Sequence, residues 1–221
     1  MAPDAVDGAL RSARRYGGLS GLAFVALFGI GNALWAFDAP SPGAPPAEIV
    51  AFYDDTASEI VVGASLSLLS VAAFGLFAAS VRTALAGRDE ALANASFGGA
   101  LLGLSAGIGA ESINMVGALR AESGDLSPDL AQSVFEISQA LGTTAASVGI
   151  AIFGIAAALA CLRTGRMLSR RESVFVLAIG LSLLTPAARI IVWPGAAMML
   201  LAATISVALL RAERRASQPA S

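Results

Sequence analysis

Residues 137–162 read ISQALGTTAASVGIAIFGIAAALACL, a run of 26 residues without a charged side chain. An α-helix needs about 20 apolar residues to cross the roughly 30 Å hydrocarbon core of a bilayer. Strands of a membrane β-barrel would instead show alternating segments of about 10 residues, and this run does not alternate. The run therefore predicts a membrane-spanning helix.

Further uncharged runs lie on both sides of this one, at 17–37, 60–81, 91–110, 173–188 and 190–210. The shortest can use Glu172 and Arg189 as snorkelling ends. We expect an all-α, polytopic transmembrane bundle of six spans in one domain, 17–210, between an N-terminal segment, 1–16, and a tail, 211–221. The predicted spans are about 17–37, 60–81, 93–119, 133–162, 172–188 and 190–210.

The composition supports this class of protein. Of the 221 residues, 56% are hydrophobic and only 14% are charged, with a net charge of −2. This argues against a disordered chain, a nucleic-acid partner and an ordinary soluble enzyme. The chain has no His and one Cys, which removes His-based metal sites, Cys clusters and nucleophile–His pairs. We expect no cofactor, no metal and no enzymatic activity.

Positive charge is confined to alternate segments. All 14 basic residues are Arg, and 12 of them lie before the first predicted span, between the second and third, between the fourth and fifth, or after the sixth. The intervening segments are rich in Asp and Glu. Cytoplasmic loops carry the excess of basic residues, so both termini are predicted to be cytoplasmic. The Arg- and Ala-rich composition suggests the inner membrane of a bacterium with a GC-rich genome.

Two segments near the predicted spans bear on helix boundaries. The piece 47–53 is either a short interfacial helix or a plain connector. Ser127, Pro128 and Asp129 give a capping residue, a proline at the first helical position and an acid in the first turn, which is typical of a helix start.

Small residues recur every four positions on the third span, at Gly99, Gly103 and Gly107, and the fourth span carries Gly142 and Ala146. Small residues let helix backbones approach closely in lipid. The two interpretations are packing within the chain and association of two copies.

Polar residues interrupt the spans at similar depth. Glu111 lies about 25 Å beyond Asn94, Asn32 about 24 Å beyond Tyr16, and Arg189 about 25 Å beyond Glu172, at 1.5 Å per residue. Glu111 continues the glycine series and Asn114 follows it, so both are predicted to face the bundle. The fourth span adds Gln132, Glu136, Gln139, Thr143 and Ser147 at helical spacing.

These residues predict an outward-facing polar pocket lined by Asn32, Glu111, Asn114, Glu136, Gln139 and Arg189. Arg189 would pair with Glu111 or Glu136. Three interpretations stay open: a site for a small solute or a proton-coupled step at Glu111, an ion pair that only fixes helix packing, and an Arg189 that snorkels to lipid phosphates. The two acids lack the nucleophile motif or metal ligands expected of an enzyme.

Boundary residues of the spans resemble those of uncharacterised six-helix membrane proteins of high-GC bacteria. The resemblance rests on Ala47-Glu48-Ile49, Phe52-Tyr53-Asp54-Asp55, Val81-Arg82 and Leu162-Arg163-Thr164-Gly165. It implies architecture and location and assigns no reaction. We therefore expect a membrane protein that acts either as a transporter or as a structural or regulatory subunit. Its partners are the lipid bilayer and either a second copy or another membrane protein.

Overall fold

The computed structural model describes residues 3–87, 89–165, 167–186, 190 and 192–216. Their secondary structure is helical throughout, with turns and short connections between helices. The order of elements is α1 (Pro3–Ala33), α2 (Pro46–Leu85), α3 (Glu90–Glu122), α4 (Pro128–Gln139), the π-helix η1 (Ala140–Ala145), α5 (Ala146–Thr164), α6 (Arg170–Ser182) and α7 (Val192–Ala216). The all-α prediction is confirmed.

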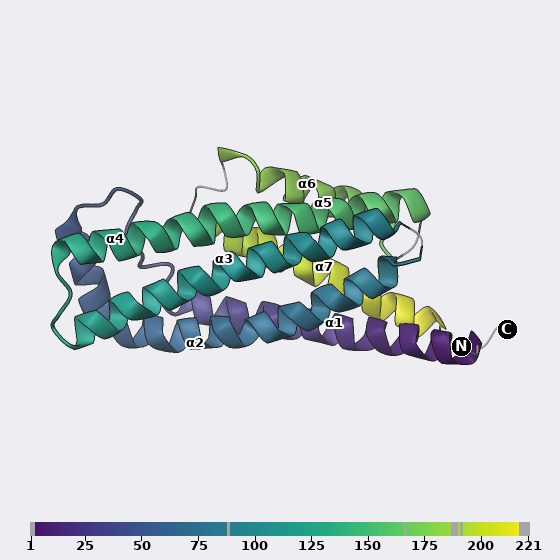
Figure 1. Ribbon diagram of the computed structural model, residues 1–221, viewed down its shortest axis with the longest axis horizontal. Coiled ribbons are helices and arrows are strands. Elements are labelled where there is room, and N and C mark those ends of the chain that lie inside the picture. Colours follow the sequence, from purple (N-terminus) through teal and green to yellow (C-terminus); the bar gives the residue numbers. More distant parts are fainter. Residues whose placement is uncertain (1–2, 88, 166, 187–189, 191, 217–221) are drawn as a thin grey trace.

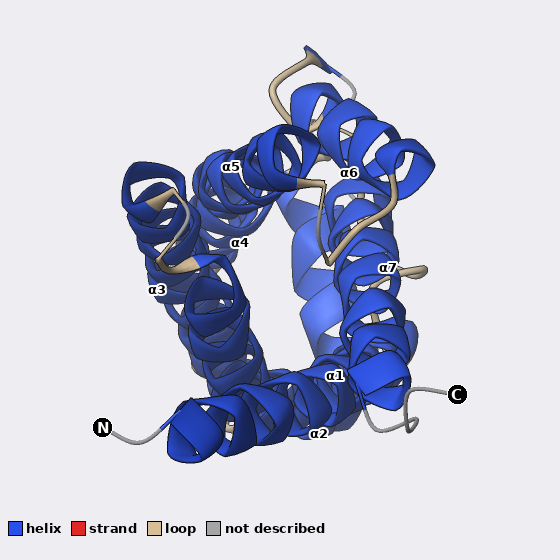
Figure 2. Ribbon diagram, turned by 90° about the vertical axis from the view of Figure 1, so that its right-hand side faces the viewer, coloured by secondary structure: helices blue, strands red, loops and turns tan. Residues whose placement is uncertain are grey.

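The helices form a ring when the bundle is viewed along its length (Figure 2). Contacts run from α1 to α2, α2 to α3, α3 to α5, α5 to α6, α6 to α7 and α7 back to α1. The start of α1 and the end of α7 lie at the same end of the bundle (Figure 1). We call this the Arg-rich end, because Arg14, Arg82, Arg163 and Arg211 lie on the helix segments that meet there.

Side chains tie the helices together at the Arg-rich end. Asp89 caps α3 by accepting a hydrogen bond from the Leu92 N–H, and Arg163 of α5 donates to the same carboxylate at 2.9 Å. These interactions, the Leu92 bond first, hold the pKa of Asp89 below its usual value. Glu172 of α6 pairs with Arg211 of α7 at 2.8 Å.

The opposite end extends well beyond the predicted spans. The backbone of Thr56 is not helical (φ −122°, ψ 17°), so a kink divides α2 into a short first part, 46–55, and a long second part, 57–85. At 1.5 Å per residue the second part is about 44 Å long, which exceeds the hydrocarbon thickness. Residues 47–53 lie in the short first part of α2, so they form a short helix and not a plain connector. Their apolar side chains are buried in a separate cluster, the distal cluster: Trp35, Ile49, Phe52, Tyr53, Ala57, Ile60, Ala118, Ala131, Val134 and Phe135.

The fourth predicted span begins where the capping residues indicate. The Ser127 side chain accepts a hydrogen bond from the Leu130 N–H, with Pro128 in the first turn of α4. α4, η1 and α5 then continue as one helical rod of 37 residues, 128–164. Within η1 the Ala146 N–H donates to the carbonyl of Leu141, five residues earlier. Such wide turns often occur at functional sites.

Two boundaries of the predicted spans are wrong. α1 begins at Pro3 and ends at Ala33, so most of the predicted N-terminal segment is helical. α6 has only 13 residues and ends at Ser182, instead of continuing to 188. Pro186 disfavours helical geometry in the residue before it, and a count of uncharged residues does not detect this.

Five helical segments of the described chain are long and apolar enough to cross a membrane: 12–33, 46–85, 90–122, 128–164 and 193–215. Their surfaces agree with that composition. Leu69 and Leu76 of α2 and Leu102 of α3 expose 59%, 65% and 49% of their surface. A soluble protein rarely leaves such large apolar areas exposed to water.

Three glycines allow α3 and α5 to touch backbone to backbone. A Cβ added at Gly99 would lie 2.6 Å from the Phe153 nitrogen and 2.8 Å from the Gly149 carbonyl oxygen, and one at Gly149 would collide with the Gly103 backbone. Nearby, Ser96 donates a hydrogen bond to the Phe153 carbonyl at 3.2 Å. These contacts support the packing interpretation for Gly99 and Gly103.

We predict that Gly99→Ala destabilises the protein by about 1–3 kcal/mol, because the new methyl group forces two backbones apart. Gly98→Ala, one residue away on the exposed side of α3, meets nothing within 4 Å and should change stability by less than about 0.5 kcal/mol. Thermal unfolding in detergent measures both variants. Equal stability of the two would contradict this account of the α3–α5 contact.

Candidate functional site

A cavity of about 210 Å³ lies inside the ring, between α1, α2, α3, α7 and the α4–η1–α5 rod. Its polar lining residues lie on the side of the distal cluster, where Trp35, Ala36 and Phe37 add apolar surface, and its lining toward the Arg-rich end is apolar. The polar lining comprises Asn32, Ser67, Ser70, Glu111, Asn114, Ser138, Gln139 and Thr143. The apolar wall includes Phe24, Phe28, Leu104, Ile150, Met198 and Met199. The cavity therefore has the polarity of an amphiphilic molecule.

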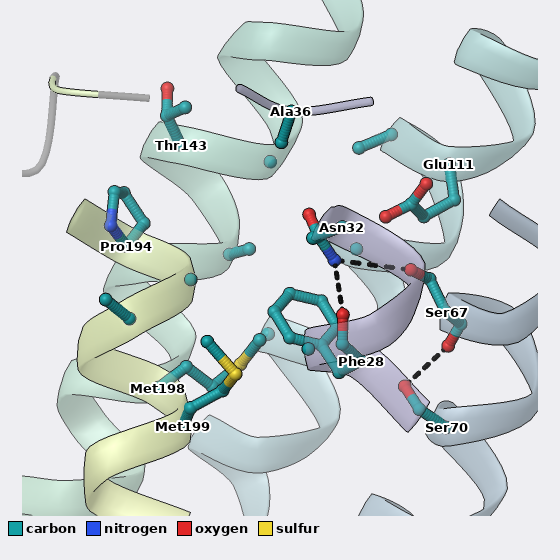
Figure 3. Close-up of a pocket in the computed structure, with 18 of the residues that line it drawn as sticks. Phe28, Asn32, Ala36, Ser67, Ser70, Glu111, Thr143, Pro194, Met198 and Met199 are labelled. Atoms are coloured by element: carbon teal, nitrogen blue, oxygen red, sulfur yellow. Dashed lines mark hydrogen bonds between the residues drawn. The ribbon is translucent and has the colours of Figure 1, made fainter. Parts of the chain in front are cut away.

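Glu111 is the acidic residue of this cavity. Its carboxyl group points toward Ser67 of α2 and the Asn32 side of the cavity (Figure 3). Its Oε2 atom is buried and has no hydrogen-bond partner among the described residues. A buried charged group without a partner is costly, so this atom is the least satisfied polar feature of the site.

Asn32 and Ser67 connect α1 to α2 beside Glu111. The Asn32 side-chain amide donates to the Phe28 carbonyl at 3.0 Å and to the Ser67 hydroxyl at 3.3 Å (Figure 3). Asn32 thus lies in the predicted layer, and its amide nitrogen is already engaged. This arrangement leaves its carbonyl oxygen as the group available to a ligand.

Asn114 lies one turn beyond Glu111, and it is paired on one side. The Tyr53 hydroxyl donates to the Asn114 Oδ1 at 3.1 Å, and Tyr53 is fully buried. Gly117 makes room for the tyrosine ring, since a Cβ there would lie 2.7 Å from the ring carbon Cε1. This pair joins α2 to α3 at the side of the cavity that faces the distal cluster.

The rod α4–η1–α5 divides its polar residues between cavity and surface. Gln139 and Thr143 line the cavity, whereas Glu136 is exposed and accepts a hydrogen bond from Gln132 at 2.9 Å. Glu136 is therefore not a lining residue, which corrects the prediction.

Arg189, the sixth predicted lining residue, lies outside the described residues. The lining nearest to it in sequence comes from the first turns of α7, where Pro194 faces the cavity from the same side as Thr143 (Figure 3). Met198 and Met199 continue that wall toward the Arg-rich end. No basic residue is among the described lining residues.

The predicted small residues combine packing with lining, since Gly103, Gly107, Gly142 and Ala146 all line the cavity. A Cβ added at Gly103 would lie 2.9 Å from the Ile150 Cδ1, and one added at Gly142 would lie at an ordinary 3.4 Å from the Ala110 Cβ. Gly107 differs, because a Cβ there meets nothing within 4 Å and the residue faces the cavity. Gly107 leaves open space beside Glu111.

Sequence reasoning missed Tyr53, Ser67 and Trp35 as site residues. Serine and tyrosine are common in membrane helices, and their spacing on α2 carries no distinct pattern. Trp35 is 6% exposed and lines the cavity, and its Nε1 has no partner among the described residues. Ser67 could have been found from its spacing, because it lies seven residues, or two helical turns, after Ile60 and therefore on the same face of α2.

Five apolar helical segments surrounding a partly polar cavity define a multi-pass helical membrane protein. Within the described ranges, no group of three His, Cys, Asp or Glu side chains is arranged to hold a metal ion. Comparisons with protein-family models, curated proteins and solved structures found no match to this chain.

We predict that Tyr53→Phe destabilises the protein by about 1–3 kcal/mol, since it leaves a buried amide oxygen without its donor. Tyr16→Phe is the matched control, because Tyr16 is 68% exposed and should be neutral. The measurement is thermal unfolding of Tyr53→Phe and its control Tyr16→Phe. Asn114→Leu and the double variant Tyr53→Phe/Asn114→Leu complete a double-mutant cycle. Additive effects in this cycle would show that the pair does not interact.

Proposed function

We propose that this protein binds a small, largely apolar molecule in its central cavity, with Glu111 as the polar anchor. One observation carries the proposal: the buried Glu111 Oε2 atom has no partner among the described residues, yet it faces an apolar-walled cavity. Binding sites for small molecules are typically apolar with a few placed polar groups. An ionisable residue inside a membrane bundle is by default a functional candidate.

A purely structural role explains this arrangement less well. Among the described residues that line the cavity no cation lies on the carboxylate, and Gly107 leaves open space beside it. A binding cavity with an ionisable residue inside a membrane bundle serves transport. Binding is the step of transport that the cavity supports, and it can be tested by itself.

The number of spans and their orientation in the membrane determine where the cavity lies. We infer six spans, with α6 in the fifth, predicted at 172–188, and with both termini in the cytoplasm of a bacterium and the protein in the inner membrane. The support is the concentration of Arg at the end where α1 begins and α7 ends, against acids such as Asp54, Asp55 and Glu122 at the other. The cavity would then lie in the outer half of the membrane.

Thiol labelling of intact cells tests this topology. In a Cys161→Ser background, Ser41→Cys in the loop before α2 should react with a membrane-impermeant maleimide added outside. Thr83→Cys at the end of α2 should react only after the cells are opened. Both positions are exposed, so folding does not hide them. The opposite pattern would reverse the orientation.

Binding can be observed through Trp35, because it lines the cavity and the chain has only 2 Trp. In a Trp193→Phe background we expect saturable quenching of Trp35 fluorescence by 1-bromo-4-tert-butylbenzene, a neutral probe whose bromine quenches on contact. Gly107→Leu fills the cavity and should weaken the apparent affinity by about tenfold or more, as expected when a new side chain overlaps a ligand.

Gly98→Leu is the control for this measurement. It places the same side chain on the same helix, but on the exposed side, where an added Cβ meets nothing within 4 Å. It should bind the probe as the parent does. Equal quenching of the Gly107→Leu and Gly98→Leu proteins would place the probe in detergent or lipid and would contradict the proposal.

A further inference from the structure

We propose that the ligand of the central cavity is a monovalent organic cation with an apolar body, and that it competes with a proton for Glu111. The inference rests on the proposed function, because it assigns the ligand class of the same cavity. It is carried by the charge of the lining, the nature of the walls and their order along the bundle.

The charge of the lining is unbalanced. Glu111 is the sole ionisable side chain among the described residues that line the cavity. The polar groups that neighbouring elements present are neutral: Asn32 from α1, Ser67 from α2 and Gln139 from α4. Because an isolated carboxylate is strongly disfavoured in an apolar interior, it requires either a proton or a cation.

The walls favour a cation whose remaining surface is apolar. Phe24 and Phe28 stack with their ring centroids 5.3 Å apart, and both line the cavity with Trp35. The rings of Phe24 and Phe28 give the apolar body of the ligand a surface to pack on, while its charge lies beside Glu111. Met198 and Met199 add flexible, polarisable surface. A metal ion would find a single carboxylate here, whereas an organic cation uses both charge and walls.

The order of the lining fixes the orientation of such a ligand. Along α3 the apolar Leu104 and the acidic Glu111 are seven residues apart, which is about 10 Å of helix. A cationic group beside Glu111 therefore directs an apolar group of about one aromatic ring toward Phe24 and Ile150. The cavity volume of about 210 Å³ suits this size.

Binding of the cation balances in charge. When Glu111 is protonated, the incoming cation replaces the proton, the carboxyl O–H bond breaks, and the proton leaves to water. The product is a carboxylate paired with the cation, so one proton is released for each cation bound. No oxidation or reduction takes part. This competition couples the occupancy of the cavity to pH, and binding weakens as pH falls.

A pair of isosteric probes tests the inference in the Trp193→Phe protein. The (4-bromophenyl)trimethylammonium ion and 1-bromo-4-tert-butylbenzene have the same shape and differ by one positive charge. At about pH 8 the cation should quench Trp35 with at least about tenfold higher apparent affinity than the neutral probe. Near pH 5 the affinity for the cation should fall, while that for the neutral probe stays constant.

Glu111→Gln keeps the size of the side chain and removes its charge. It should abolish both the preference for the cation and its pH dependence, while the neutral probe still binds. Glu136→Gln is the matched control, because Glu136 is the exposed acid of the neighbouring rod. It should retain the preference of the parent.

The outcomes separate this inference from the proposed function. If the neutral probe binds in a manner blocked by Gly107→Leu but the cation binds no better, the inference is overturned and the cavity remains a binding site. If neither probe binds, both proposals fail. If the preference for the cation appears only in Arg189→Gln, Arg189 is the counter-ion of Glu111 and the inference is overturned.

Discussion

The backbone contact between α3 and α5 determines where the cavity can form. Gly99, Gly103 and Gly149 bring the two helices together near the Arg-rich end. At the other end, α3 is held by Tyr53, whose ring packs on Gly117 beside Val134. Between these two contacts α3 packs on η1, where Leu141 lies beside Gly109 and Gly142 beside Ala110. One face of α3 in this stretch, from Gly103 to Asn114, lines the cavity. The cavity thus lies beyond the stretch of α3 in which glycines allow backbone contact with α5.

Hydroxyl groups in the same helices show why Glu111 is exceptional. Ser65, Ser80, Ser105 and Thr204 each donate to the carbonyl four residues earlier in their own helix. A helix can therefore satisfy serine and threonine in lipid without any partner helix. An ionised carboxylate has no proton to donate to such a carbonyl. Glu111 must be satisfied from outside its own helix, and the described neighbours leave one of its oxygens free.

The helices were predictable from the sequence because uncharged runs report the thickness of the bilayer, but their ends were not. Glu59 set the start of the predicted second span at 60, although α2 begins at Pro46 and, before its kink at Thr56, buries Ile49 and Phe52 in the distal cluster. At 172–188 the absence of charge suggested a full span, and Pro186 limits the helix instead. Of the candidate site, Asn32, Glu111, Asn114 and Gln139 line one cavity. The exposure of Glu136 depends on tertiary contacts that the spacing alone does not contain.

The glycine series on α3 shows how one sequence pattern serves two purposes. Residues four apart on an α-helix are separated by about 40° around its axis, because a full turn takes 3.6 residues. Gly99 and Gly107 therefore differ by about 80°, and Glu111 by about 120° from Gly99. The first two glycines meet α5, the third has turned into the cavity, and the fourth position of the series is the carboxylate. A straight ridge would have placed Glu111 against α5, where a charged side chain has no room. The rotation of about 40° at each step of four residues brings Glu111 to the cavity. This is why a series of packing residues ends at the candidate binding group.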